Sequence, residues 1–476
     1  MLFNSFNFSI FLPIVFICFW VFAKGKLIRQ NLLLLVASYF FYGCWDVRFL
    51  GLLLFSTGLD YVLGLKIQNS SNDKLRKGLF ILSLLANICL LVVFKYYNFF
   101  MESLNDGFSF IGINSSFQTL NFLLPIGISF YTFHSLSYII DIYKKKINAE
   151  TNVVDYALFI SFFPLLVAGP IERANHLLPQ FKSLKRFDYS STIEGLKQIL
   201  WGLFKKVVIA DQCAEYVDLI FSNPADESGS TMLVGAVLFS FQIYGDFSGY
   251  SDIAIGTARL FGIDLLKNFS FPYFSRSIAE FWRRWHISLS SWFKDYVYIP
   301  LGGSYGAKST TIRNVIIVFL LTGFWHGANW TFIFWGLLNA LLIIPSIIRK
   351  TNRNHLEIVA KGKILPSLVE ISSICFTFLL ISLSWIFFRS ENLNEVFSIF
   401  SKIFSSSIFS IPTYKPFGLF IYLMIVLFFE WKGREGEYAF SSLNYPKIVR
   451  WVIYYGLVLS ILYFCRLEHQ FIYFEF

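Results

Sequence analysis

The sequence predicts an all-α integral membrane protein that crosses the bilayer about eleven or twelve times. Two observations lead to this fold class. The 476 residues are 56% apolar, 20% aromatic and only 15% charged, whereas about a quarter of the residues in soluble domains are charged. Apolar stretches of about 18 residues or more recur along the chain, and each is long enough to cross a hydrocarbon core of roughly 30 Å. We therefore treat residues 1–476 as a single membrane domain.

Individual spans follow from apolar length and loop charge. The first stretch is expected to stay as a helix and not to be a secretory signal, because no basic residue precedes it and KGKLIRQ follows it. Two other segments, 150–170 and 270–303, have basic loops at both ends, so we interpret them as re-entrant or interfacial. The expected crossings lie near residues 6–23, 31–44, 47–65, 79–100, 121–142, 192–220, 231–262, 312–328, 330–348, 368–388, 416–431 and 448–465.

The net charge of +10 is distributed as expected for a membrane protein. Basic residues gather in short loops between the spans, whereas residues 102–120 and 222–231 contain none. The positive-inside rule then places the basic loops in the cytosol and the N-terminus outside. This distribution indicates that the basic residues face membrane lipid and do not bind nucleic acid.

Few ionisable groups lie at membrane depth, where such groups are costly and often functional. His326 in GFWHGANW is the strongest candidate, because Gly323, Gly327 and Ala328 are expected to leave room for a substrate beside its ring. His134 lacks such space and is interpreted as a structural core residue.

Two further polar groups allow both a functional and a structural interpretation. Asp246 and Asp252 would suit a cation or proton site, but the Gly and Ser residues between them favour a kinked helix and a structural role. The segment EFWRRWHISLSSWFKDYVYIPLGG, which begins one residue before Phe281, combines aromatic and basic residues as an interfacial anchor does. That interpretation leaves His286 unexplained.

Other site chemistries are not indicated. The six cysteines are scattered and form no C-x-x-C pair, and the chain contains neither H-E-x-x-H nor G-x-S-x-G. We expect no bound metal or cofactor.

Several of these segments together resemble the membrane-bound O-acyltransferase family. The similarity rests on residues 280–303, on GFWHGANW, LPIGISFYTFHSLSYIID and GDFSGYSDIAIGTARLFGI, and on the final FIYFEF, and it covers nearly the whole chain. It is strongest to the bacterial alginate O-acetyltransferase branch, and the teichoic-acid D-alanylation branch is more distant. The resemblance implies helices around a central funnel or tunnel, with His326 near its narrowest point and His286 as a second polar residue.

The resemblance also implies substrates and partners. The donor would be a cytosolic thioester, acetyl-CoA or an acylated carrier protein, and the acceptor an extracytoplasmic polysaccharide. A partner of the SGNH-hydrolase type would complete the transfer outside, and the protein would lie in a bacterial cytoplasmic membrane.

Chemistry suggests roles for these residues. An imidazole with a pKa near 6.5 suits a general base that takes a hydroxyl proton, which is the role expected of His326. Trp325 and Trp330 would wall a water-poor neck, and His286 or Asn329 would donate to the oxyanion. A set of basic residues would attract the phosphates of the donor, although ordinary membrane anchoring explains them equally well. The set consists of Arg276, Arg283, Arg284, Lys294 and Lys308.

Two alternatives from other functional classes remain open. An ion-coupled polysaccharide transporter or exporter would use Asp246, Asp252 and Glu280 along its path, although no inverted repeat supports it. A non-catalytic scaffold of an acetylation complex would need neither histidine.

Overall fold

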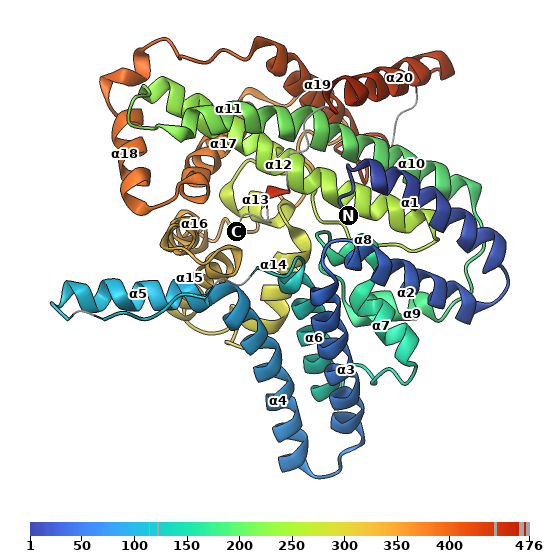
Figure 1. Ribbon diagram of the computed structural model, residues 1–476. Coiled ribbons are helices and arrows are strands. Elements are labelled where there is room, and N and C mark those ends of the chain that lie inside the picture. Colours follow the sequence, from blue (N-terminus) through green and yellow to red (C-terminus); the bar gives the residue numbers. More distant parts are fainter. Residues whose placement is uncertain (114, 121–122, 442–444, 466–470, 473–476) are drawn as a thin grey trace. The chain divides into compact units, whose positions relative to one another are not determined.

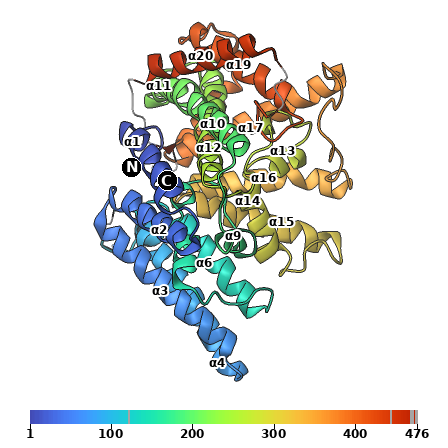
Figure 2. The same cartoon turned by 90° about the vertical axis from the view of Figure 1, so that its right-hand side faces the viewer.

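The computed structural model describes residues 1–113, 115–120, 123–441, 445–465 and 471–472. Within these ranges the chain forms helices and loops and no strand (Figures 1 and 2). The predicted all-α class is therefore confirmed.

The chain divides into two compact units. The first comprises Met1–Thr192 and Thr257–Leu266. In it, α3, α4 and α6 lie side by side in both views. Its elements are α1 (Phe6–Ile17), η1 (Cys18–Phe22), α2 (Leu27–Gly43), α3 (Val47–Asn69), α4 (Asp73–Leu91), η2 (Val92–Tyr96), α5 (Tyr97–Phe110), α6 (Ile128–Tyr143), α7 (Val153–Ser161), α8 (Phe163–Leu166) and α9 (Ala174–Phe181).

The second unit comprises Ile193–Gly256 and Lys267–Phe476. Helix α10 begins in the first unit and helix α12 ends there, but most residues of both helices belong to the second unit. Its elements are α10 (Tyr189–Leu203), η3 (Phe204–Ala210), α11 (Asp211–Ser222), α12 (Gly229–Leu260), η4 (Pro272–Phe274), α13 (Ile278–Arg284), α14 (Ile287–Phe293), η5 (Lys294–Tyr298), α15 (Lys308–His326), α16 (Trp330–Ile348), α17 (Leu368–Arg389), α18 (Leu393–Ile403), η6 (Ser406–Phe409), α19 (Phe417–Gly433) and α20 (Lys447–Phe464).

Five helical stretches among the described residues are long and apolar enough to cross a membrane. They are α3, the continuous run Asp73–Phe110, α16, α17 and α20, and the apolar stretch Phe6–Phe22 is shorter. The remaining predicted crossings coincide with helices that are shorter or more polar. The protein is thus a multi-pass membrane protein, while the count of eleven or twelve crossings and the side of the N-terminus stay predictions.

Two details of the predicted spans are refined by the structure. The helix expected over 121–142 begins at Ile128, because Pro125 precedes it and Gly127 takes a left-handed conformation with φ of 74°. Residues 121 and 122 lie outside the described part. The two segments interpreted as re-entrant contain only short helices, of which the longest, α7, has nine residues. Such helices are too short to cross a bilayer.

Glycines let α10 and α12 approach closely in the second unit. A Cβ added to Gly202 would lie 2.5 Å from the carbonyl oxygen of Gly249, and one added to Gly256 would lie 2.5 Å from that of Gly195. Small residues at helix contacts are typical of membrane proteins, where packing replaces the hydrophobic drive between helices. This contact fixes the part of α12 that carries Asp246 and Asp252.

Both of these carboxylates are paired with lysines from η3. Lys206 Nζ lies 2.7 Å from Asp246 and 2.8 Å from Asp211, and all three side chains are buried. The other oxygen of Asp246 accepts a hydrogen bond of 2.6 Å from the backbone N–H of Ile472. Lys205 Nζ lies 2.7 Å from Asp252. The geometry fits the structural roles favoured for these two residues.

His134 also has the surroundings of a structural residue. It is 1% exposed in α6, and its Nε2 accepts a hydrogen bond of 3.1 Å from the backbone N–H of Glu172.

The Lys206 pairing yields a prediction about stability. We expect Lys206→Met to destabilise the protein by about 3–5 kcal/mol, because it leaves two buried carboxylates without their cation. Thermal unfolding of the detergent-solubilised protein would measure this loss. Lys447→Met, at an exposed lysine, is the control. A melting temperature of Lys206→Met within about 2 °C of the control would contradict the assignment.

Candidate active site

His326 is positioned by a close contact between α15 and α16. A Cβ added to Gly323 would lie 2.3 Å from the carbonyl oxygen of Phe332, and one added to Gly336 would lie 2.3 Å from that of Phe319. The two helices lie side by side in both views (Figures 1 and 2). Because His326 is the last residue of α15, this contact holds its backbone against the start of α16.

The role expected of Gly323 and Gly327, room for a substrate beside His326, is wrong, whereas that of Ala328 stays a prediction. The space beside Gly323 is filled by the backbone of α16, and a Cβ on Gly327 would lie 2.1 Å from the ring of Phe332. These glycines therefore admit a neighbouring helix and an aromatic ring. Room for a substrate arises elsewhere around the histidine.

Aromatic rings surround the imidazole of His326, which is 3% exposed. Its centroid lies 4.9 Å from that of Trp325, 5.2 Å from that of Trp335 and 5.2 Å from that of Phe388. The Trp335 ring stands at 90° to the imidazole. Such edge-to-face contacts hold a ring in one orientation in a setting of low polarity.

His286 lies at the junction of α13 and α14 and is 2% exposed. Its φ of 43° is unusual for a residue other than glycine and costs about 1–3 kcal/mol. Two backbone hydrogen bonds flank this turn: Ser270 N–H donates to Arg284 O over 2.9 Å, and Ile287 N–H donates to Asn268 O over 2.8 Å. The local backbone thus holds His286 in a conformation that it would otherwise disfavour.

The ring of His286 has a polar contact on one nitrogen. Its Nδ1 lies 2.9 Å from Oδ1 of Asn268, which is fully buried. Its Nε2 is buried and has no hydrogen-bond partner among the described residues. The ring packs edge-on against Phe247, with centroids 4.6 Å apart, and lies 6.2 Å from Trp325. Trp325 therefore contacts both imidazoles.

The two histidines line the same cavity, which has a volume of about 550 Å³. Its lining includes His286 and His326, which are buried, and the exposed residues Lys294, Arg353 and Leu356, which we call the mouth. The wall is mostly apolar and aromatic. It includes Trp282, Trp285, Leu289, Phe293, Tyr298, Val318, Phe319 and Ile343. One cavity is therefore lined both by exposed side chains and by the two buried imidazoles.

The predicted basic residues play different parts. Arg283 lines the cavity, but its guanidinium donates to the carbonyl oxygens of Asn352, Asn354 and His355. It thereby fixes the loop at the cavity mouth. Arg284 is not a lining residue and lies 2.8 Å from Glu280.

Arg276 and Lys308 are likewise not cavity-lining residues. Arg276 lies 3.1 Å from Glu280 and 3.0 Å from Glu357. A hydrogen bond from its own backbone and the nearby Arg276 lower the pKa of Glu357. That carboxylate is therefore ionised at neutral pH and helps to neutralise Arg276. Lys294 is the remaining member of the predicted basic set, and it lines the mouth.

Trp330 and Asn329 lie at the start of α16 and do not line the cavity. Trp330 is 50% exposed. The side chain of Asn329 accepts a hydrogen bond of 2.9 Å from Thr331 N–H, and its amide donates to Glu391 O over 2.8 Å. Asn329 therefore caps the N-terminus of α16. The predicted oxyanion role of Asn329 stays a prediction that this geometry does not support.

Several site residues were not anticipated. Trp335 and Phe388 enclose His326, and Trp282 lines the cavity with an indole Nε1 that has no hydrogen-bond partner among the described residues. A signal for Trp335 exists in the sequence, because Thr331, Trp335 and Asn339 recur at four-residue spacing in an apolar helix and mark its interior face.

Comparison with known proteins identifies the family. Residues 144–390 of this chain match the family model described as MBOAT, membrane-bound O-acyltransferase family. The chain belongs to this family and is an O-acyltransferase. The matched range includes both histidines and every residue that lines the cavity.

Individual relatives agree with this assignment. The probable alginate O-acetylase AlgI of Azotobacter vinelandii is 42% identical over 377 residues, which cover 79% of this chain and 73% of that protein. The peptidoglycan O-acetyltransferase of Helicobacter pylori is 39% identical over 420 residues, covering 82% and 77%. The teichoic acid D-alanyltransferase of Streptococcus thermophilus is more distant, with 30% identity over 245 residues, covering 49% and 58%. The resemblance deduced from the sequence is confirmed.

The capping geometry of Asn329 yields a second prediction. Serine also caps helices well, so we expect Asn329→Ser to keep wild-type transfer activity, whereas Asn329→Ala lowers the free energy of unfolding by about 1 kcal/mol. Activity assays and thermal unfolding of both variants would check this. If Asn329→Ser folded normally but lost transfer activity, the amide would have a chemical role that the cap does not explain.

Proposed function

We propose that this protein moves an acetyl group from a cytosolic thioester across the membrane for O-acetylation of an extracytoplasmic polysaccharide, with His326 as the general base. The observation that carries this proposal is one cavity lined by the buried His286 and His326 and by the exposed basic side chains Lys294 and Arg353. The names of the relatives, alginate O-acetylase and peptidoglycan O-acetyltransferase, support an acetyl group and a polysaccharide acceptor.

In the proposed reaction His326 removes the proton from an acceptor hydroxyl. The oxygen then attacks the thioester carbonyl carbon and forms a tetrahedral intermediate. When this collapses, the C–S bond breaks, an ester remains on the acceptor, and the proton held by the imidazole passes to the departing thiolate. An imidazole suits both steps because its pKa lies near neutral pH.

The aromatic surroundings would protect the donor from hydrolysis. Trp325, Trp335 and Phe388 enclose the His326 ring, and a water-poor site disfavours attack by water on an activated acyl group. The negative oxygen of the intermediate needs a donor in this setting. The indole N–H of Trp282, a buried donor in the cavity wall, is better placed for that role than the capping side chain of Asn329.

The mouth of the cavity suits the thioester donor. It is lined by Lys294, Arg353 and the loop that Arg283 holds, and this loop belongs to the basic segment 349–363. The positive-inside rule places that segment in the cytosol. Exposed cations at the mouth would attract the phosphates of acetyl-CoA or of an acylated carrier protein.

The remaining parts of the proposal concern the cellular setting. The protein would lie in a bacterial cytoplasmic membrane with its N-terminus outside. An SGNH-hydrolase-type partner would complete transfer to the polymer beyond the membrane. The protein itself would need no bound metal or cofactor.

The pairing of buried charges weighs against ion-coupled transport. Asp246, Asp252 and Glu280 each lie within 3 Å of a lysine or arginine. Carboxylates neutralised in this way are poor carriers for a coupling ion, because their partner would have to leave first. A pure scaffold would have no use for a cavity lined by two buried imidazoles.

The base assignment yields a third prediction. We expect His326→Ala to fold but to lose about 10²- to 10⁴-fold in transfer rate, the usual contribution of a general base. Single-turnover assays with labelled acetyl thioester, and ester analysis of the surface polymer, would measure this. His176→Ala, at a partly exposed histidine, is the control. Normal ester content with His326→Ala would exclude the proposed base.

The cavity mouth yields a fourth prediction. We expect Lys294→Gln to raise KM for the thioester donor roughly two- to fivefold, with a smaller effect at high salt, because an exposed charge contributes weakly and is screened. Lys308→Gln is the matched control, since Lys308 does not line the cavity. Assays with acetyl-CoA and with acylated carrier protein would show which donor responds. Equal KM values for the two variants with both donors would contradict entry at this mouth.

A further inference from the structure

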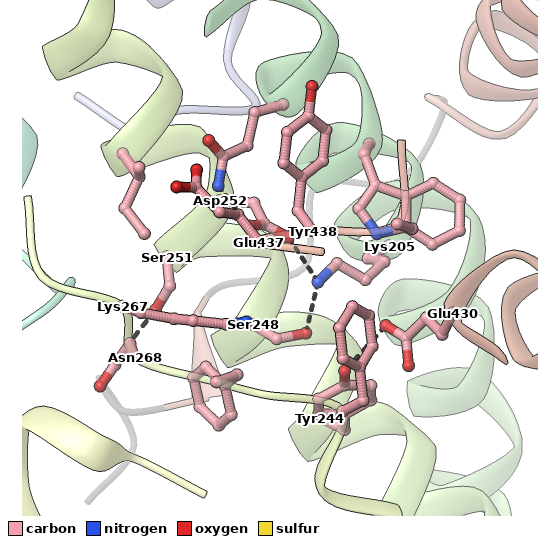
Figure 3. A pocket seen from close by; sticks show the side chains of 16 residues that line it. Lys205, Tyr244, Ser248, Ser251, Asp252, Lys267, Asn268, Glu430, Glu437 and Tyr438 are labelled. Atoms are coloured by element: carbon pink, nitrogen blue, oxygen red, sulfur yellow. Dashed lines mark hydrogen bonds and ion pairs between the residues drawn. The ribbon is translucent and has the colours of Figure 1, made fainter. Parts of the chain in front are cut away.

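A small polar chamber has Asn268, the hydrogen-bond partner of His286, in its wall. The chamber has a volume of about 30 Å³, room for about one water molecule. Figure 3 shows its charged and hydroxyl side chains, with Lys205 joined to Asp252 and Ser248. Asn268 lies in its wall and reaches the histidine from there.

The hydrogen bonds of Asn268 fix which end of its amide faces His286. Its Nδ2 donates to Ser251 Oγ over 3.0 Å, the bond drawn in Figure 3. Its Oδ1 lies 2.9 Å from His286 Nδ1 and 2.8 Å from Ser288 Oγ. Since an amide oxygen can only accept, both of these partners must donate to it.

This arrangement selects one form of the neutral imidazole. If Nδ1 carries the proton that Asn268 accepts, Nε2 carries the lone pair. Nε2 is the nitrogen that has no hydrogen-bond partner among the described residues. The neutral ring would therefore offer the reacting groups a proton acceptor and not a donor.

We propose that Asn268 is the positioning residue of the active site, which fixes the orientation of His286 and holds its ring as the Nδ1–H tautomer with Nε2 free to take a proton. This rests on the proposed function, in whose cavity His286 lies with His326, and adds that the Nε2 of His286 takes a proton during the reaction. Asn268 contacts no reacting atom and acts only through the histidine. In this tautomer the neutral ring of His286 has no N–H at Nε2. His286 would therefore accept a proton there, instead of donating to the oxyanion as expected from the sequence.

The most direct test is the tautomer itself. The full-length protein in lipid nanodiscs, labelled with ¹⁵N-histidine, would give nitrogen shifts for each imidazole, and a His286→Gln sample would identify the signals of His286. We expect a protonated Nδ1 and an unprotonated Nε2 at neutral pH. A protonated Nε2 in the wild-type protein would overturn the proposal without requiring any variant of Asn268.

A pair of variants tests the consequence for turnover. Asn268→Leu keeps the approximate volume but removes the acceptor, and we expect kcat to fall about 10- to 100-fold with KM for acetyl-CoA nearly unchanged, as for other residues that orient a functional histidine. Its spectrum should show loss of the pure Nδ1–H form. Ser291→Ala, in the same helix α14, removes only the hydrogen bond of 2.8 Å from Ser291 Oγ to Ser288 O and should keep both the tautomer and most of kcat.

The outcomes separate this proposal from the proposed function. Asn268→Leu with an unchanged tautomer and unchanged kcat, while His286→Gln is inactive, would overturn the positioning role alone. Equal losses in Asn268→Leu and Ser291→Ala would also overturn it, because they would indicate general loosening of the site. Full activity of His286→Gln would instead overturn the role of His286 in catalysis, whatever the spectra of Asn268→Leu show.

Discussion

The candidate active site depends on the contact of α15 with α16 at Gly323 and Gly336. Any side chain at either position would collide with a main-chain carbonyl oxygen of the facing helix. Membrane helices associate through such close packing, because lipid provides no hydrophobic drive to bring them together. The contact sets the end of α15, and with it the place of His326 among Trp325, Trp335 and Phe388. The position of the His326 ring therefore follows from the close approach of the α15 and α16 backbones.

Several buried charges of the second unit are paired with opposite charges. Lys206 lies beside Asp246, and Arg284 lies beside Glu280. The buried residues of the cavity wall, by contrast, include two imidazoles among aromatic rings. Unpaired charge would be costly there, whereas an imidazole can stay neutral and still exchange a proton at physiological pH. Such surroundings suit the proposed reaction, in which a thioester is kept away from water.

Much of this architecture could be predicted from the sequence, because apolar length and loop charge are strong local signals. The helical class and the five long apolar helices follow from such signals. The family follows instead from motifs such as GFWHGANW, and the resemblance singled out His286, which lines one cavity with His326. The function of the glycines near His326 was misjudged, because only the fold shows that α16 fills that space. Asn268 gave no signal, since its partners are 17 to 20 residues away in the chain. Asn329 has the pattern of a cap, which its polar type alone does not distinguish from a substrate contact.

In the proposed function an acyl group reaches both imidazoles through the cavity whose mouth is lined by Lys294 and Arg353. An electron cryomicroscopy structure of the full-length protein with a non-hydrolysable acetyl-CoA analogue would show whether it does. We expect nucleotide phosphates beside Lys294 and Arg353, and the acetyl carbonyl between His286 and His326. An analogue bound at another surface, with this cavity empty at saturating concentration, would contradict this expectation.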